Sequence, residues 1–389
     1  MSTQDDFVTH EAATEKKREY DAHIDDIARV FWNDEAKDED KDDSEEYTAQ
    51  CHCGSIRDII DLPLEDIPYK GYICCCTVCR LTSGGFGGFF VTFRKAKPLW
   101  RQGKPPRRFN VPYAKPDDDD RPFCGTCGAC NNNDNKCLID IYTIDTSLFI
   151  DQFWQFAGIR HSGTTGDGGL LPWLPTLARK EPVTYNNVGE VAPTYELEVG
   201  SDGGPRLRAK CCCGGVSFTI PRPSAAVRED TYLRKYISPI DPQKWKAFLD
   251  VSNETRRTSG IAFMPWMLVP RVALEPEVPS DLLLGTMKTY KSSEKVTRGF
   301  CGTCGAKVFL KTTDRSPSED SEVLGIAMGI LRAPEGMRAD NWVTWRAGRL
   351  EGVPDKGPIH DNIFVGDLRK GHKAWALEKY GEAPEFDIM

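Results

Sequence analysis

Three cysteine clusters decide how the first half of this chain folds: Cys51-His52-Cys53-Gly54, Cys74-Cys75-Cys76-Thr77-Val78-Cys79 and Cys124-Gly125-Thr126-Cys127-Gly128. With Cys75 left aside, these clusters supply seven thiols, which is more than one tetrahedral zinc ion uses. Four thiolates close a structural zinc site, whereas three leave a position open, and an open position is where zinc does chemistry. The surplus of thiols is therefore the main functional clue in the sequence.

The second half of the chain repeats the two outer clusters but not the middle one. The repeated pairs are Cys211-Cys212-Cys213-Gly214 and Cys301-Gly302-Thr303-Cys304-Gly305. The segment that follows the middle cluster, Arg80-Leu81-Thr82-Ser83-Gly84, is matched by Arg256-Arg257-Thr258-Ser259-Gly260. Internal similarity on this scale indicates two duplicated domains rather than a solenoid.

The match also shows what the second half has lost. Carried back without gaps from Arg256, it aligns Cys74, Cys76 and Cys79 with three residues that are not cysteine: Asp250, Ser252 and Thr255. The second half is longer ahead of this point, and the spacing places the extra residues around Lys235–Phe248. A second copy of the middle cluster is therefore not expected.

Composition and charge narrow the class of protein. The 389 residues are enough for two domains with cores of their own, and a hydrophobic content of 40% is ordinary for a soluble globular protein. The net charge of -8 argues against nucleic acid as a partner. The start at Met1–Asp6 does not resemble a signal peptide, and the longest apolar stretch, Phe263–Val269, is too short to span a bilayer. We therefore expect a cytoplasmic protein without membrane contact.

The fifteen cysteines are read first as metal ligands or reactive thiols, because disulfides are rare in a reducing compartment. Pairs separated by one or two residues and followed by glycine have poor geometry for a disulfide. They suit a zinc knuckle, because the glycine lets backbone N–H groups turn back toward the thiolates. Disulfides remain the alternative for these pairs.

Along the chain we expect an acidic extension and two β domains. Residues 1–46 form the extension, with a helix over His10–Phe31 and a charged linker over Asp34–Glu46. The domains span residues 47–185 and 190–380, and the proline-rich Leu171–Pro182 suggests their join. Alternating hydrophobicity predicts half-buried strands, so the fold class is mainly β. These strands are Leu138–Tyr142, Val216–Ile220 and Lys307–Lys311.

With all three clusters and the Arg-x-Thr-Ser-Gly segment in place, the chain resembles the glutathione-dependent formaldehyde-activating (CENP-V/GFA) family, as a tandem two-domain member of the type common in fungi. The resemblance implies two tandem Mss4-like β domains, each stapled by a structural zinc. It assigns one such zinc to Cys51, Cys53, Cys124 and Cys127, and the other to Cys211, Cys213, Cys301 and Cys304. It assigns a catalytic zinc to Cys74, Cys76 and Cys79.

The resemblance also implies a reaction. It is that of an S-(hydroxymethyl)glutathione synthase, a carbon–sulfur lyase that joins glutathione, as co-substrate, to formaldehyde. Three thiolates weaken the Lewis acidity of a zinc ion, which favours binding of the substrate thiol over activation of the aldehyde. Another small electrophile could replace formaldehyde. A different class of function is a non-catalytic glutathione carrier or a zinc-stabilised binding scaffold.

Several residues have alternative interpretations. The middle cluster could instead be a structural site completed by His52, Cys75 or His161. His161 and His360 each precede a glycine-rich, tryptophan-bearing segment of their half, and this recurrence predicts a structural role with hydrogen bonds to the backbone. Arg80 and the Arg94-Lys95 pair could meet the carboxylates of glutathione, but solvated surface cations are the commoner outcome. Single buried thiols are expected at Cys130 and Cys137, and core positions at the tryptophans.

Overall fold

The computed structural model describes residues 44–94, 100–101, 103–109, 121–131, 134–137, 141–186, 191–354 and 360–389. Ser44–Met389 make up one compact unit. The helix expected over His10–Phe31 lies outside the described residues. Of the linker expected over Asp34–Glu46, only Ser44–Glu46 is described, and these residues begin a strand.

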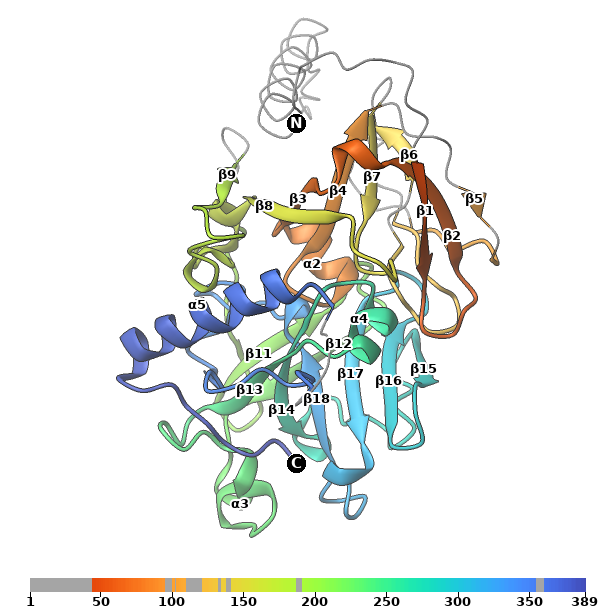
Figure 1. Cartoon of the computed structure of the whole chain (residues 1–389). Helices are drawn as coiled ribbons and strands as arrows, with labels where there is room; N and C mark the ends of the chain where they lie inside the picture. The colour runs from red at the N-terminus through yellow and green to blue at the C-terminus, as the bar shows by residue number, and fades with distance from the viewer. Residues whose placement is uncertain are drawn as a thin grey trace, which may run out of the picture. The chain divides into compact units, whose positions relative to one another are not determined.

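The first half of this unit contains two sheets (Figure 1). The smaller sheet has the order β1-β2-β5, from Ser44–Gln50, Arg57–Pro63 and Trp100–Arg101. The larger has the order β6-β7-β4-β3-β8-β9. Its strands in chain order are β3 Tyr69–Cys74, β4 Gly88–Arg94, β6 Asp134–Cys137, β7 Ile141–Asp145, β8 Trp154–Arg160 and β9 Val183–Tyr185, and the short helices of this half are η1 Leu64–Asp66, α2 Thr77–Ser83, η2 Ser162–Thr165 and η3 Leu171–Trp173.

The second half is built in a similar way. A small sheet has the order β10-β11-β12, from Glu198–Val199, Pro205–Lys210 and Ser217–Pro221. The large sheet has the order β15-β16-β17-β18-β14-β13-β19. Its strands are β13 Trp245–Asp250, β14 Met264–Pro270, β15 Met287–Lys291, β16 Val296–Cys301, β17 Lys307–Thr312, β18 Val323–Ala327 and β19 Val343–Trp345, and the helices are α3 Ala225–Glu229, η4 Leu233–Tyr236, α4 Asn253–Ser259, η5 Arg271–Ala273, η6 Thr313–Arg315, η7 Met328–Ile330 and α5 Asn362–Tyr380.

The two large sheets share a strand order. The run β8-β3-β4-β7-β6 of the first corresponds to β19-β13-β14-β18-β17 of the second. In both, the first strand pairs in parallel with a late strand, as β3 with β8 and β13 with β19. In both, a seven-residue helix, α2 or α4, connects the two central strands. The prediction of a mainly β fold is confirmed.

The strand predictions hold where they can be compared. Val216–Ile220 overlaps β12, and Lys307–Lys311 lies within β17. Of Leu138–Tyr142, the last two residues begin β7, and residues 138–140 lie outside the described part. The tryptophans expected in the core are buried: Trp154, Trp173, Trp266, Trp342 and Trp345.

Two expectations about chain organisation can be compared with the structure. Lys235–Phe248, where the extra residues of the second half were expected, lies between β12 and β13 as far as residue 244, whereas Trp245–Phe248 is core strand of β13. In the proline-rich Leu171–Pro182, where the join of the domains was expected, Trp173, Leu174 and Leu177 are buried. The segment's η3 packs against α5 near the end of the chain. Burial by an element so distant in sequence is not visible in composition.

The two halves contact each other reciprocally through the ends of α2 and α4, which lie between the two large sheets in Figure 1. A Cβ on Gly84, just after α2, would lie 2.3 Å from the carbonyl oxygen of Lys307. A Cβ on Gly260, just after α4, would lie 2.2 Å from that of Cys130. Both glycines have positive φ, and both ends therefore require glycine. Cys130 and Lys307 are at matching positions, each just after the second cysteine pair of its half. Each helix therefore ends against the segment that follows the other half's second cysteine pair.

A buried histidine lies where α5 joins the first half. The ring of His372 is fully buried, 4.4 Å from the ring of Trp173 and stacked on Trp375 at 5.8 Å. Neither of its ring nitrogens has a hydrogen-bond partner among the described residues. Burial lowers the pKa of His372 to about 3.

We expect acid to destabilise the protein through His372. The unfolded histidine takes up a proton below about pH 6.5, whereas the folded one stays neutral down to about pH 3, so stability is lost as the pH falls between these values. At pH 5 the loss is about 2 kcal/mol. Urea unfolding at pH 7 and pH 5 measures it, and His372→Phe should reduce the loss by about that amount. An equal acid loss in both proteins would contradict the assignment.

Candidate metal centres

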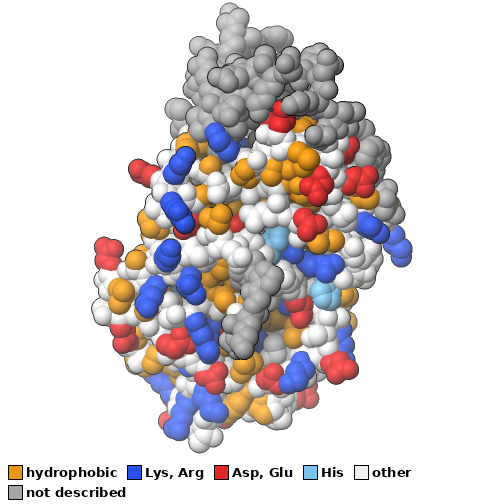
Figure 2. Space-filling model, viewed as in Figure 1, with side chains coloured by type: hydrophobic (Ala, Val, Ile, Leu, Met, Phe, Trp, Pro, Cys, Tyr) orange, Lys and Arg blue, Asp and Glu red, His pale blue; other side chains and the backbone are white. Residues whose placement is uncertain are grey.

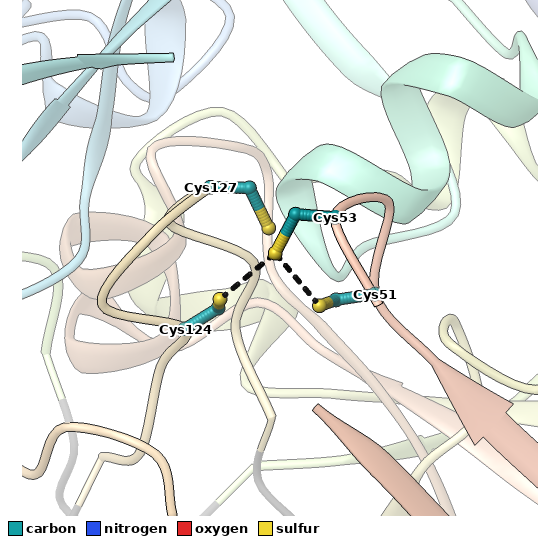
Figure 3. A group of neighbouring side chains, drawn as sticks. All are labelled: Cys51, Cys53, Cys124 and Cys127. Atoms are coloured by element: carbon teal, nitrogen blue, oxygen red, sulfur yellow. Dashed lines mark hydrogen bonds between the residues drawn. The ribbon is translucent and has the colours of Figure 1, made fainter. Parts of the chain in front are cut away.

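Four thiols of the first half converge at one point (Figure 3). Cys51 and Cys53 follow β1, and Cys124 and Cys127 lie in a turn further along the chain. The sulfur of Cys53 is 3.5 Å from those of both Cys51 and Cys124, and all four sulfurs lie within 4.8 Å of one another. Four thiolates about 2.3 Å from a zinc ion stand about 3.8 Å apart. The spacing therefore fits a tetrahedral zinc site.

The second half repeats this arrangement with Cys211, Cys213, Cys301 and Cys304. The sulfur of Cys213 is 3.6 Å from that of Cys211 and 3.5 Å from that of Cys301, and the four sulfurs lie within 4.8 Å of one another. None of the described cysteines forms a disulfide. The cysteines of these clusters are therefore free thiols rather than disulfides, and both sets can hold a metal ion.

Backbone turns shape both clusters as expected. Gly54 has a φ of 72° and donates its N–H to the Cys51 carbonyl at 3.0 Å, and Gly214 has a φ of 75° and donates to the Cys211 carbonyl at 3.1 Å. Backbone amides just after these turns donate hydrogen bonds to cysteine sulfur atoms. That of Ile56 donates to the sulfur of Cys51 at 3.3 Å, which stabilises the thiolate form that binds metal.

The middle cluster forms a third group of thiols. Cys74 ends β3, Cys76 caps α2, and Cys79 lies in the first turn of α2. Their sulfurs lie within 4.8 Å of one another, and the amide of Cys79 donates to the sulfur of Cys76 at 3.4 Å. Cys74 and Cys79 are buried, whereas Cys76 is half-buried. Hydrogen bonds from Cys74 and Cys79 hold the pKa of Cys76 well below that of an ordinary thiol. Cys76 is therefore the most readily ionised thiol of the three, because its hydrogen bond with Cys74 raises the pKa of that thiol well above the usual value, and the pKa of Cys79 is raised as well.

No fourth ligand joins this triad in the described part of the chain, where the group contains only the three cysteines. Of the alternatives, His52 instead hydrogen-bonds the Tyr290 hydroxyl at 2.8 Å. Cys75 is fully buried, and burial raises the pKa of its thiol to about 12. His161 is outside the group as well. The arrangement can thus hold a metal ion with one coordination position left for another molecule.

In the second half, polar side chains replace the triad at the corresponding positions. Asp250 ends β13, Ser252 caps α4, and Thr255 lies in its first turn. The Ser252 hydroxyl accepts the amide of Thr255 at 3.2 Å, and Asp250 accepts both the Ser252 amide, at 2.9 Å, and the Thr255 hydroxyl. Hydrogen bonds therefore close this corner of the fold without requiring a metal ion.

The sheet register shows which residue of the second half corresponds to His161. Cys74 pairs with Arg160, and at the matching place Asp250 bridges to Glu351. The next residues, His161 and Gly352, are therefore equivalent, and both have positive φ, at 58° and 79°.

The predicted equivalence of His161 with His360 was therefore wrong. His360 instead lies 5.5 Å from the ring of Trp154, and its Nε2 has no hydrogen-bond partner among the described residues. His161 is close enough to Cys76 to contribute to lowering its pKa, after the larger effect of the two other thiols. A histidine accompanies the triad only in the first half. The similar sequence surroundings of His161 and His360 could not show this. A bulge in the pairing of β3 with β8 shifts which residues of the two halves correspond.

Arg80 is also placed differently from the expectation. Its side chain is only 2% exposed, so it is not a solvated surface cation. Lys95 and the side chain of Arg94 lie outside the described residues. Cys130, predicted to be a single buried thiol, is buried with its sulfur 3.5 Å from Nζ of Lys307, and the side chain of Cys137, for which the same was predicted, lies outside the described part.

On the face shown in Figure 2, acidic and basic side chains are interspersed among the described residues. In the described part of the chain, no helix combines the length and the apolar character needed to cross a membrane.

The fold and the thiol clusters define a cysteine-rich, mainly β protein with three groups of thiols that could each hold a metal ion. Residues 46–155 match the family described as glutathione-dependent formaldehyde-activating enzyme. The matched segment includes all seven clustered thiols of the first half and none of those of the second. A comparison with curated proteins gives no match.

Proposed function

We propose that the first half is a zinc-dependent carbon–sulfur lyase that joins glutathione to formaldehyde or a related small electrophile. The observation that supports this most is the triad of Cys74, Cys76 and Cys79, which offers three converging thiols without a fourth ligand, inside the segment that matches the family. The donor set suits zinc, since soft thiolates select it. A bound zinc would stabilise a substrate thiol as thiolate at neutral pH.

The chain's own residues supply the rest. The new bond joins the substrate sulfur to the aldehyde carbon, and the carbonyl oxygen takes up the proton that the thiol loses. Because free thiols add to formaldehyde unaided, the protein's contribution is proximity and orientation. The half-buried Cys76 marks the accessible side of the triad, and His161, next to it, is positioned to exchange a proton with the reacting groups.

We also propose that the halves are tandem copies of one Mss4-like domain, spanning residues 47–185 and 190–380. The common strand order and the matching α2 and α4 support this. Each copy would hold one structural zinc, and only the first would hold a third, catalytic zinc. Closely spaced free thiols persist in a reducing compartment, which supports a cytoplasmic location.

Exchange NMR tests the reaction. Glutathione and formaldehyde interconvert with S-hydroxymethylglutathione, and the zinc-loaded protein is expected to speed this exchange well beyond the uncatalysed rate. The same protein with Cys76→Ser should not. A rate equal to that of buffer, with glutathione nevertheless bound, would favour the alternative function of a glutathione carrier.

A further inference from the structure

A cleft beside α2 is lined by residues of both halves. It has a volume of about 140 Å³. Arg80 of α2 lies at its wall, together with residues from the turn after β8, the connecting segment and the loop after η7. Among them are Thr165, Gly166, Tyr195, Leu331 and Met337.

The walls of this cleft are held in place by the chain itself. The amide of Met337 donates to the carbonyl of Thr165 at 3.2 Å. Close by, Arg338 donates through Nη1 to the carbonyl of Gly169 at 2.7 Å, and its amide donates to Asp167 at 2.7 Å. The cleft is therefore preformed rather than dependent on a ligand for its shape.

Arg80 is a buried cation without a counter-ion. Its side chain is 2% exposed, and its only hydrogen bond within the described part is a long one of 3.5 Å to the Thr77 hydroxyl. Its Nε has no partner there, and no described carboxylate forms an ion pair with it. A buried guanidinium is costly unless it is paired, so a residue in this state is unusual outside a binding site.

The equivalent arginine of the second half shows that the fold can satisfy this position. Arg256 donates through Nη1 to the carbonyls of Ser147 and Phe149, the latter at 3.0 Å, and through Nε to Asn253 at 3.3 Å. Arg80 makes no such contacts with the second half, and in their place it faces the cleft. The arginine without backbone partners in the other half is thus the one that belongs to the half with the thiol triad.

A second cation adds to the positive field. The guanidinium of Arg332 lies 5.4 Å from the ring centre of Tyr195, which lines the cleft. Arg332 also forms no ion pair with a described carboxylate, and its hydrogen bond is to the Ile330 carbonyl at 3.4 Å. Two unpaired cations beside one small cleft favour an anion, and a planar carboxylate suits the fork of a guanidinium.

We propose that this cleft binds a carboxylate of the thiol substrate and that Arg80 is the residue that holds it. The inference rests on the proposed function for the identity of the substrate. Two segments, α2 and the turn after β8, contribute residues both to the cleft and to the surroundings of the triad. Arg80 and Cys76 belong to the same short helix, and Arg80 reaches back to Thr77, next to Cys76. The turn that begins at His161, near Cys76, continues to Thr165 in the cleft.

Binding of S-methylglutathione tests the cleft apart from the metal chemistry, because this probe keeps both carboxylates but has no free thiol. In titration calorimetry on the zinc-loaded protein, Arg80→Met is expected to weaken its binding about tenfold or more. Ser252→Ala, which changes the equivalent helix cap of the second half, should leave it unchanged. The diester of the same probe should bind the wild type as weakly as the acid binds Arg80→Met. Equal affinity of wild type and Arg80→Met, or no binding to the wild type, would overturn the proposal.

The outcomes separate this inference from the proposed function. If the exchange reaction is not accelerated but S-methylglutathione still binds in an Arg80-dependent way, the reaction fails and the cleft stands. If the exchange is accelerated and the KM for glutathione is the same in Arg80→Met, the reaction stands and the cleft fails.

Thermal unfolding excludes a merely structural role. Because Arg80→Met removes an unpaired buried charge, its Tm should equal or exceed that of the wild type. Arg256→Met, which removes hydrogen bonds to backbone carbonyls, should lower the Tm. A fall of similar size in both variants would show that Arg80 stabilises the fold, and would contradict its assignment to ligand binding. Arg80→Lys, which keeps the charge, is expected to recover part of the affinity.

Discussion

Replacing Cys304 with serine is expected to unfold the second half of the protein and to release about one zinc ion per chain. Its thiol is one of four that converge within 4.8 Å, and it is 1% exposed. A structural zinc site contributes on the order of 10 kcal/mol in small zinc domains, which is comparable to the whole stability of a typical domain. Zinc analysis and circular dichroism should show the loss of metal together with a fall in Tm of roughly 10 °C or more.

A neighbouring cysteine provides the control for that experiment. Cys212 lies between two of the converging cysteines but is not part of their group. Cys212→Ser should keep both the zinc content and the Tm of the wild type. If Cys304→Ser also retained both, the cluster would not be a metal site on which the fold depends.

Replacing Cys76 with serine is expected to have the opposite profile, with activity lost and the fold retained. This variant should bind about one zinc fewer than the wild type, and the exchange rate should fall by about a hundredfold or more, because even outer partners of a metal ligand matter ten- to a hundredfold. The Tm should change little, because a serine can still cap α2, as Ser252 caps α4. Zinc analysis, exchange NMR and thermal unfolding of the same preparation measure all three.

The second half supplies a matched control here too. Ser252→Ala changes the equivalent cap, which accepts the amide of Thr255 at 3.2 Å. It should lower stability by about 1 kcal/mol and leave zinc content and exchange rate unchanged. Finding only two zinc ions in the wild-type protein would remove the basis for a catalytic zinc at the triad.

The parts of the molecule that could be predicted from sequence are those set by local chemistry. A cysteine pair followed by glycine has few possible geometries, and the family resemblance implied which pairs meet, Cys51 with Cys124 and Cys211 with Cys301. Alternation identified β12 and β17 for a similar reason. The ungapped comparison also located Asp250 correctly at the end of β13.

The rest depends on contacts between distant segments. Arg80 follows a cysteine on a short helix, and its burial beside a cleft lined by residues of both halves depends on how the halves pack. The role of His161 depends on the parallel pairing of β3 with β8, which is interrupted by a bulge. Likewise, the burial of Trp173 depends on α5, about two hundred residues further on. Such placements are fixed by tertiary packing and leave no periodic signal in the sequence.

The reciprocal contacts of Gly84 with Lys307 and of Gly260 with Cys130 have a bearing on how such a molecule arises. A surface that meets its own equivalent in this way has the geometry of a two-fold homodimer. When two such subunits are joined in one polypeptide, the pairing persists at an effectively fixed concentration, and the subunits need no longer be identical. Under the tandem arrangement proposed above, one copy would be free to give up its thiols and serve as a permanent partner, in keeping with the difference between Cys76 and Ser252.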